Sequence, residues 1–208
     1  MELSPIEFYQ PAVFHTVLPE NVFKSFVNST EKLGEPANAW LAGRLKEEHI
    51  IELDPIAKSW LLQAAKEYIK CGFATSVYEM TEEDEKYVDS FTTYSNDIWV
   101  NHQKKHEVNP PHCHTGDMSY VIFVKIPYDL EQEVAEYPVG TQVNQSMFDF
   151  LYTNVLGEIQ SLPMAVTSQW EGSALLFPSK MHHYVMPFST VDDTRITIAG
   201  NISVGPKI

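Results

Sequence analysis

Cysteines, long apolar runs and basic residues are all scarce in this sequence. Cys71 and Cys113 are the only cysteines, which is too few for a disulfide framework, and they are not spaced as a CxxC pair. The chain starts without the basic and apolar segments of a secretory signal, and apolar runs such as 121–124 soon end at a charge. Since a membrane-spanning helix needs about 20 apolar residues, we expect no membrane segment and a reducing, cytoplasmic location.

The shortage of positive charge also excludes a class of partner. Lysine and arginine total 14 against 28 aspartates and glutamates, which gives a formal net charge of -14. A field of that sign repels polyanions, so we expect no nucleic-acid partner. The composition is otherwise that of a globular protein, with 44% hydrophobic and 20% charged residues. A length of 208 residues allows a substantial core, and we predict a single domain over 1–208.

Residues 1–86 are predicted to form a helical support region. Apolar residues at helical spacing favour a helix from Val22 to Leu33, with Gly34 able to supply a left-handed cap. A second helix is predicted over 55–70, because Asp54 can cap it and Pro55 suits its first position. We expect both helices to pack outside the rest of the fold.

Residues 87–208 are predicted to form a mostly β, largely antiparallel core. Short runs rich in β-branched and aromatic residues, separated by turn-forming residues, predict strands at 88–101, 110–115, 118–126, 162–170, 173–177, 182–187 and 194–204. A longer insertion between Pro127 and Pro163 is predicted to contain a helix from Gln145 to Gln160.

Two groups of histidines, His112 with His114 and His182 with His183, contain the candidate metal ligands. His112 and His114 are two residues apart in a predicted strand, so their side chains point to the same face while Cys113 points to the other. His183 follows about seventy residues later on another predicted strand. Three such ligands would leave open positions for substrate and oxygen, as non-haem iron sites require. The alternative is that these histidines form structural hydrogen bonds only.

The last predicted strand has a polar face that needs an explanation. Alternation places Arg195, Thr197 and other small or polar residues on one side, and isoleucines on the other. If the polar side faces the interior, the guanidinium requires a partner, and a carboxylate ligand held by two hydrogen bonds would supply it. A structural salt bridge to an aspartate or glutamate is the alternative.

Three segments carry a resemblance to a known family. They are Asn109-Pro-Pro-His112-Cys-His114-Thr-Gly-Asp117, Glu171-Gly-Ser-Ala-Leu-Leu-Phe-Pro178 continuing to His183-Tyr-Val-Met-Pro-Phe188, and Arg195-Ile-Thr197-Ile-Ala-Gly-Asn-Ile202. In this order they resemble the 2-oxoglutarate and iron(II)-dependent oxygenases of marine bacteriophages and bacteria. The resemblance covers roughly residues 90–204 and implies a double-stranded β-helix, that is, a jelly-roll or cupin-like barrel.

The resemblance also implies site residues and an activity. His112, His114 and His183 look like the iron(II) ligands, and Arg195 with Thr197 looks like the pair that binds the distal carboxylate of 2-oxoglutarate. The implied reaction is hydroxylation of a small molecule or a protein side chain, in the host cytoplasm if the chain is phage-encoded. No catalytic residue is expected beyond the metal ligands. The sequence predicts neither the particular substrate nor an oligomeric state.

Asp117 is the alternative metal ligand. Most 2-oxoglutarate oxygenases have His-x-Asp or His-x-Glu where this chain has His112-Cys113-His114, and Asp117 is the nearest carboxylate. An odd spacing from His114 turns it away on a regular strand, so it could bind metal only if Thr115 and Gly116 formed a bulge or turn.

Two other functions remain as alternatives. A cupin-type metal enzyme would use the same kind of barrel without 2-oxoglutarate, and the spacing of His112, His114 and Asp117 suits it, whereas Arg195 with Thr197 does not. A metal-free binding or structural β-barrel protein of a phage is the second alternative, and the three intact histidines argue against it.

Overall fold

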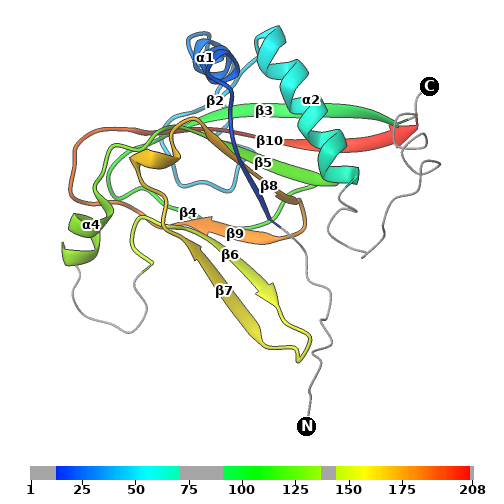
Figure 1. The fold of residues 1–208 in the computed structure, drawn as a ribbon. Helices are drawn as coiled ribbons and strands as arrows, with labels where there is room; N and C mark the ends of the chain where they lie inside the picture. Colours follow the sequence, from blue (N-terminus) through cyan, green and yellow to red (C-terminus); the bar gives the residue numbers. More distant parts are fainter. Residues whose placement is uncertain (1–12, 71–90, 137–143, 207–208) are drawn as a thin grey trace.

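The protein consists of two antiparallel β-sheets, and its N-terminal helices lie on one side of them (Figure 1). The computed structural model describes residues 13–70, 91–136 and 144–206, and for residues 70, 91–97 and 204–206 it describes the backbone only. The two sheets face each other, and α1 (Glu20–Ser29) and α2 (Pro55–Lys70) cover the outer face of the larger one. Among the helices in these ranges, none is long and apolar enough to cross a membrane.

The larger sheet has six strands, and the smaller sheet has four. In spatial order, the six are β1 (Phe14–Val17), β8 (Ser173–Pro178), β5 (Met118–Lys125), β10 (Arg195–Pro206), β3 (Phe91–Gln103) and β2 (Glu48–Ile50). The four are β4 (Asn109–His112), β9 (His182–Val185), β6 (Phe148–Thr153) and β7 (Ile159–Met164). The prediction of a mostly β, antiparallel core is confirmed.

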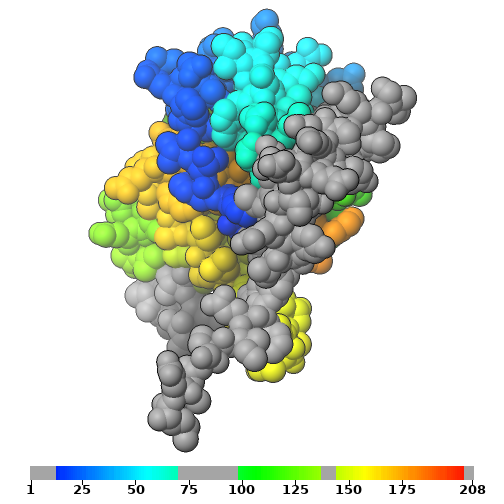
Figure 2. Space-filling model, turned by 45° about the vertical axis from the view of Figure 1, so that its right-hand side comes forward, coloured from blue at the N-terminus to red at the C-terminus, as the bar shows by residue number. Residues whose placement is uncertain are grey.

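The helix α2 spans Pro55–Lys70, as the sequence predicts. Its start is fixed by Asp54, whose Oδ1 accepts hydrogen bonds from the backbone N–H of Ile56 at 3.0 Å and from the hydroxyl of Ser25 at 2.5 Å. Leu61 and other apolar side chains of α2 are buried against the larger sheet. In Figure 2 the blue and cyan surfaces of the two N-terminal helices lie at the opposite end of the molecule from the yellow strands.

The helix α1 spans Glu20–Ser29 and is shorter than predicted. The chain leaves the helix at Thr30, whose hydroxyl donates to the carbonyl of Val27 at 2.7 Å. Gly34 is not a helix cap, because its N–H donates to the carbonyl of Ile50 at 2.8 Å. A Cβ at this position would lie 2.8 Å from that oxygen, so the close approach of two backbones explains the glycine.

The predicted helix from Gln145 to Gln160 is wrong, because this segment forms the hairpin of β6 and β7. Phe148 and Phe150 alternate with Asp149 along β6, and the two rings are buried between the sheets. Alternation with a period of two is the pattern of a strand. Gly157 lies in the turn with φ +81°, which favours glycine. The helix of the insertion is α4 (Leu130–Glu136) instead.

The predicted strand at 162–170 is also corrected. β7 begins earlier, at Ile159, and ends at Met164. A short 3-10 helix, η2 (Ser168–Trp170), follows, and the hydroxyl of Thr167 accepts a hydrogen bond from the backbone N–H of Gln169 at its start. The other predicted core strands correspond to β3, β4, β5, β8, β9 and β10, with shifted ends.

Buried apolar residues form two clusters, one on each side of the larger sheet. The outer cluster joins α1 and α2 to residues such as Ile122 and Ile198. The inner cluster lies between the sheets and is rich in aromatic rings, including Phe123, Phe148 and Phe177. The inner face of β10 therefore looks into the space between the sheets, where the candidate site lies.

Candidate metal and cosubstrate site

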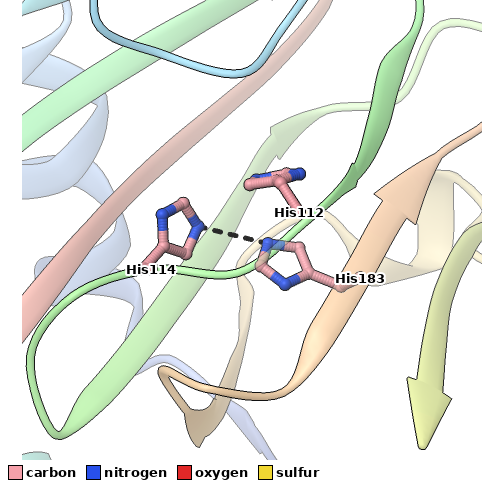
Figure 3. Close-up of side chains that lie close together, drawn as sticks. All are labelled: His112, His114 and His183. Atoms are coloured by element: carbon pink, nitrogen blue, oxygen red, sulfur yellow. Dashed lines mark hydrogen bonds between the residues drawn. The ribbon is translucent and has the colours of Figure 1, made fainter.

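The three predicted histidines meet in one cavity between the sheets (Figure 3). His112 ends β4 and is paired in register with His183 on β9. His114 follows the end of β4, and its backbone N–H donates to the carbonyl of Ser179 at 2.8 Å. The ring centroid of His112 lies 4.3 Å from that of His183 and 4.8 Å from that of His114. One nitrogen from each ring lies within 4.8 Å of the others, a spacing that suits one metal ion.

Backbone carbonyls fix the orientation of two of these rings. His112 Nδ1 lies 2.7 Å from the carbonyl oxygen of Pro110, and His183 Nδ1 lies 3.1 Å from that of Met181. A carbonyl oxygen can only accept, so each Nδ1 carries the hydrogen and each Nε2 keeps a lone pair. Metal-binding histidines show this arrangement, in which the second ring nitrogen donates to a fixed acceptor.

Burial keeps the three rings neutral. Desolvation lowers the pKa of His183 to about 3 and that of His114 to about 4, and the neighbouring imidazoles add to both shifts. Burial likewise lowers the pKa of His112. At neutral pH the three rings are therefore unprotonated, which is the form that binds metal.

Aromatic side chains from both sheets pack around the imidazoles. The ring of Phe148 stacks on His183 with a centroid distance of 5.5 Å and an angle of 6°, and Phe177 meets His183 edge-on at 4.9 Å. Trp99, from β3, lies 5.6 Å from His114. Trp99 therefore lines the cavity next to the three histidines.

Arg195 and Thr197 face the same cavity from β10, on the opposite sheet. The side chain of Arg195 is 2% exposed, yet Nη1 and Nη2 have no hydrogen-bond partner within the described ranges. Its guanidinium carbon lies 6.0 Å from the ring of Phe123. A structural salt bridge to an aspartate or glutamate is thus not found in this part of the chain. A buried, unpaired cation is costly, and an incoming carboxylate with two oxygens would relieve that cost.

Asp117 does not belong to the group of three histidines. Thr115 and Gly116 form a bend, with Gly116 at φ +95°, but the side chain of Asp117 is exposed. The backbone N–H of Asp117 donates to the carbonyl of Ile202 at 3.0 Å. Cys113 is also exposed and carries a free thiol.

Asn101 and Asn109 line the cavity as well, and the sequence analysis missed both. The Oδ1 atom of each is buried and has no hydrogen-bond partner in the described part of the chain. Asn101 could have been found from alternation on β3, because Trp99, Asn101 and Gln103 share a face that is buried although two of the three are polar. Asn109 gave no such signal.

A comparison with known protein families shows which family this chain belongs to. The family described as "Putative 2OG-Fe(II) oxygenase", where 2OG stands for 2-oxoglutarate, matches residues 97–201, about half of the chain. The chain belongs to this 2OG-Fe(II) oxygenase family. It is an oxygenase whose cofactors are iron(II) and 2-oxoglutarate. The matched range contains all three histidines as well as Arg195 and Thr197, which favours the oxygenase over a cupin-type enzyme without 2-oxoglutarate.

Solved structures support the fold of this oxygenase. A prolyl-4-hydroxylase from Pseudomonas putida is similar over 92% of this chain and 91% of its own, with a TM-score of 0.50 and 12% identity. A 2OG-Fe(II) oxygenase family oxidoreductase from Burkholderia pseudomallei is similar over 91% and 85%, with the same score and identity. At such identity the likeness concerns the fold. Among curated proteins, no match is found.

The residues of the oxygenase fit both cofactors. Three neutral imidazoles present nitrogen ligands within 4.8 Å of one another, and imidazole is a suitable ligand for iron. Two buried guanidinium nitrogens without partners in the described ranges face the same cavity. The cavity therefore has three imidazoles that could hold a metal ion on the side of the smaller sheet and an unpaired guanidinium on the larger sheet.

Proposed function

We propose that this oxygenase hydroxylates a C–H bond, with iron(II) held by His112, His114 and His183. Arg195 and Thr197 bind the distal carboxylate of 2-oxoglutarate. The observation that carries the proposal is the buried guanidinium with two unpaired nitrogens in the same cavity as the imidazoles. Bound together, iron(II) and 2-oxoglutarate supply the oxidising chemistry, in which one oxygen atom of O2 enters the substrate and 2-oxoglutarate becomes succinate and carbon dioxide.

The side chains of the chain bind, orient and exclude water. The carbonyls of Pro110 and Met181 hold two ligand rings in the tautomer that leaves Nε2 free for the metal. The stacked ring of Phe148 and the nearby Trp99 restrict rotation of the imidazoles and keep the cavity wall apolar. A low local dielectric strengthens the interaction between the guanidinium and a carboxylate.

We also propose that the fold is a double-stranded β-helix. Supporting this, the chain passes between the sheets repeatedly: β3, β5, β8 and β10 lie in the larger sheet, and β4, β6, β7 and β9 lie in the smaller one. The origin in a marine phage or bacterium and the cytoplasmic location remain predictions from the sequence.

The proposed substrate is a small molecule or a protein side chain. One of the similar structures is a prolyl-4-hydroxylase, so proline-containing peptides are the first compounds to test. Formation of succinate without a substrate, compared with its formation in the presence of each candidate, would identify a compound that couples to turnover.

The test of the proposed cofactor site is an anaerobic titration of the full chain with iron(II) and then 2-oxoglutarate. We expect one iron(II) per chain, followed by a weak visible charge-transfer band when 2-oxoglutarate chelates the metal. Tight metal binding without that band would favour the cupin-type alternative. Absence of stoichiometric metal binding would favour the metal-free binding protein.

A further inference from the structure

We infer that Asn101 is a positioning residue for 2-oxoglutarate: its amide turns the hydroxyl hydrogen of Thr197 toward the carboxylate that Arg195 receives. The inference rests on the proposed function, because it assumes that Thr197 and Arg195 bind this carboxylate. Asn101 itself does not need to touch 2-oxoglutarate.

Asn101 reaches the cavity from β3, the neighbour of β10 in the larger sheet. It is paired in register with Thr197, and its side chain is 8% exposed. Asn101 Nδ2 donates a hydrogen bond to Thr197 Oγ1 at 3.2 Å. Asn101, Thr197 and Arg195 line the same cavity.

This hydrogen bond determines what the Thr197 hydroxyl can do next. A hydroxyl group carries one hydrogen and can accept two hydrogen bonds. Because Asn101 uses the oxygen as an acceptor, the hydroxyl hydrogen remains for another partner, and the described residues provide no acceptor for it. Arg195 Nη1 and Nη2 lie unpaired in the same cavity. Three donors can therefore converge on one carboxylate.

The opposite orientation of the Asn101 amide would remove one of these donors. Oδ1 would then lie beside Thr197 and accept its hydroxyl hydrogen, which would no longer point to the carboxylate. The far end of the amide does not oppose either orientation, because the buried Oδ1 atom has no hydrogen-bond partner in the described ranges. A bound carboxylate can only accept, so it favours the orientation in which Asn101 donates.

The test is a double-mutant cycle on the affinity for 2-oxoglutarate, measured by calorimetry on the full chain loaded with Mn(II) in place of iron(II). A neutral hydrogen bond is worth about 0.5–1.5 kcal/mol, so Asn101→Leu and Thr197→Val should each weaken binding about two-fold to ten-fold. If Asn101 acts through Thr197, Asn101→Leu should cause no further loss in the Thr197→Val background. Losses that multiply would overturn the inference.

Two further measurements separate positioning from general damage. Binding of 2-oxobutyrate, which lacks the distal carboxylate, should be the same in Asn101→Leu and wild type, and an equal loss for both ligands would count against the inference. Asn101→Asp should weaken 2-oxoglutarate more than Asn101→Leu, because the added carboxylate accepts the hydroxyl hydrogen and repels the ligand. An Asn101→Asp protein with wild-type affinity would contradict the scheme.

Asn144→Leu is the matched control. Asn144 lies a few residues before β6 and does not line the cavity, and its Nδ2 donates to Asp149 Oδ2 at 2.7 Å. This variant should lose stability and keep its affinity for 2-oxoglutarate, and a loss of affinity equal to that of Asn101→Leu would reject the specific role. Arg195→Met shows which claim has failed: if it leaves binding unchanged, the proposed function fails, whereas weakened binding with multiplying losses at Asn101 and Thr197 removes only this inference.

Discussion

Replacing Arg195 by methionine should change affinity and stability in opposite directions. The guanidinium is 2% exposed and has two nitrogens without partners in the described part of the chain. Removing hydrogen bonds to a charged group costs about 1.5–3 kcal/mol, and more when the other charge is left buried, so the dissociation constant for 2-oxoglutarate should rise roughly ten-fold to a few hundred-fold. Without 2-oxoglutarate, the same change removes a buried cation that no residue in the described ranges neutralises. Apolar replacements of buried ionic groups are often neutral or stabilising by about 1–4 kcal/mol. The free energy of unfolding of Arg195→Met should therefore rise, by up to about 4 kcal/mol.

Two assays on the same protein measure these effects. Calorimetry gives the affinity for 2-oxoglutarate, and urea denaturation with and without the ligand gives the free energy of unfolding. Lys125→Met is the control, because this exposed lysine pairs with Asp193 at 2.7 Å and such surface pairs are worth about 0–1 kcal/mol. Arg195→Lys should show an intermediate loss of affinity, since an ammonium lacks the planar fork. An Arg195→Met protein that binds 2-oxoglutarate as tightly as wild type would refute the reasoning.

Three further predictions concern the metal and the buried carboxyl groups. His183→Ala should abolish stoichiometric iron(II) binding and keep the circular dichroism of the fold, whereas Asp117→Ala should bind metal nearly normally. Loss of metal in Asp117→Ala, with His112→Ala unaffected, would move the site to His114, Asp117 and His183. Burial, with Glu107 nearby, raises the pKa of Glu48 to about 7. A carboxyl group whose pKa is raised by folding contributes fully to stability below its pKa in the unfolded chain and loses this contribution as the pH rises through about 7. Between pH 5 and pH 8, the free energy of unfolding of Glu48→Gln, measured by urea denaturation, should therefore rise by about 2–3 kcal/mol relative to wild type. Identical pH slopes for the two proteins would contradict that assignment. Burial tends to raise the pKa of Glu133, but hydrogen bonds from Thr190, Ser189 and Ser146 outweigh it and lower the pKa. Glu133→Gln should therefore destabilise by about 1–3 kcal/mol at pH 7, with the difference shrinking as the pH falls below the unfolded value, and a difference independent of pH would show that the charge is unimportant.

Local patterns predicted the helix α2 and the strands that carry the histidines. The capping residues around Pro55 act within a few positions of the chain, and the spacing of His112 and His114 identified two rings that share a cavity. The sequence also offered His183 as the third ligand, but its pairing with His112 on the neighbouring strand depends on the whole topology and could not be derived from local patterns.

Other features depend on contacts that one segment does not contain. The segment from Gln145 to Gln160 was predicted as a helix, but the rings of Phe148 and Phe150 are buried by partners on β5 and β8. Gly34 was predicted as a helix cap, but the position requires glycine because the backbone of Ile50 leaves no room for a side chain. Alternation on β3 could have drawn attention to Asn101, but its hydrogen bond to Thr197 on the neighbouring strand could not be predicted from local sequence.

The division of the proposed site between the two sheets links catalysis to folding. His112 and His183 belong to the smaller sheet, and Arg195 belongs to the larger one. A molecule of 2-oxoglutarate that binds both the metal and Arg195 would therefore connect the two sheets. Any opening that separates the sheets must first release it. The bound ligand adds stability that grows with the logarithm of its concentration, about 2.7 kcal/mol at a hundred-fold excess over the dissociation constant. The lifetime of the folded chain would then follow the supply of 2-oxoglutarate, and the enzyme would persist longest where its cosubstrate is abundant.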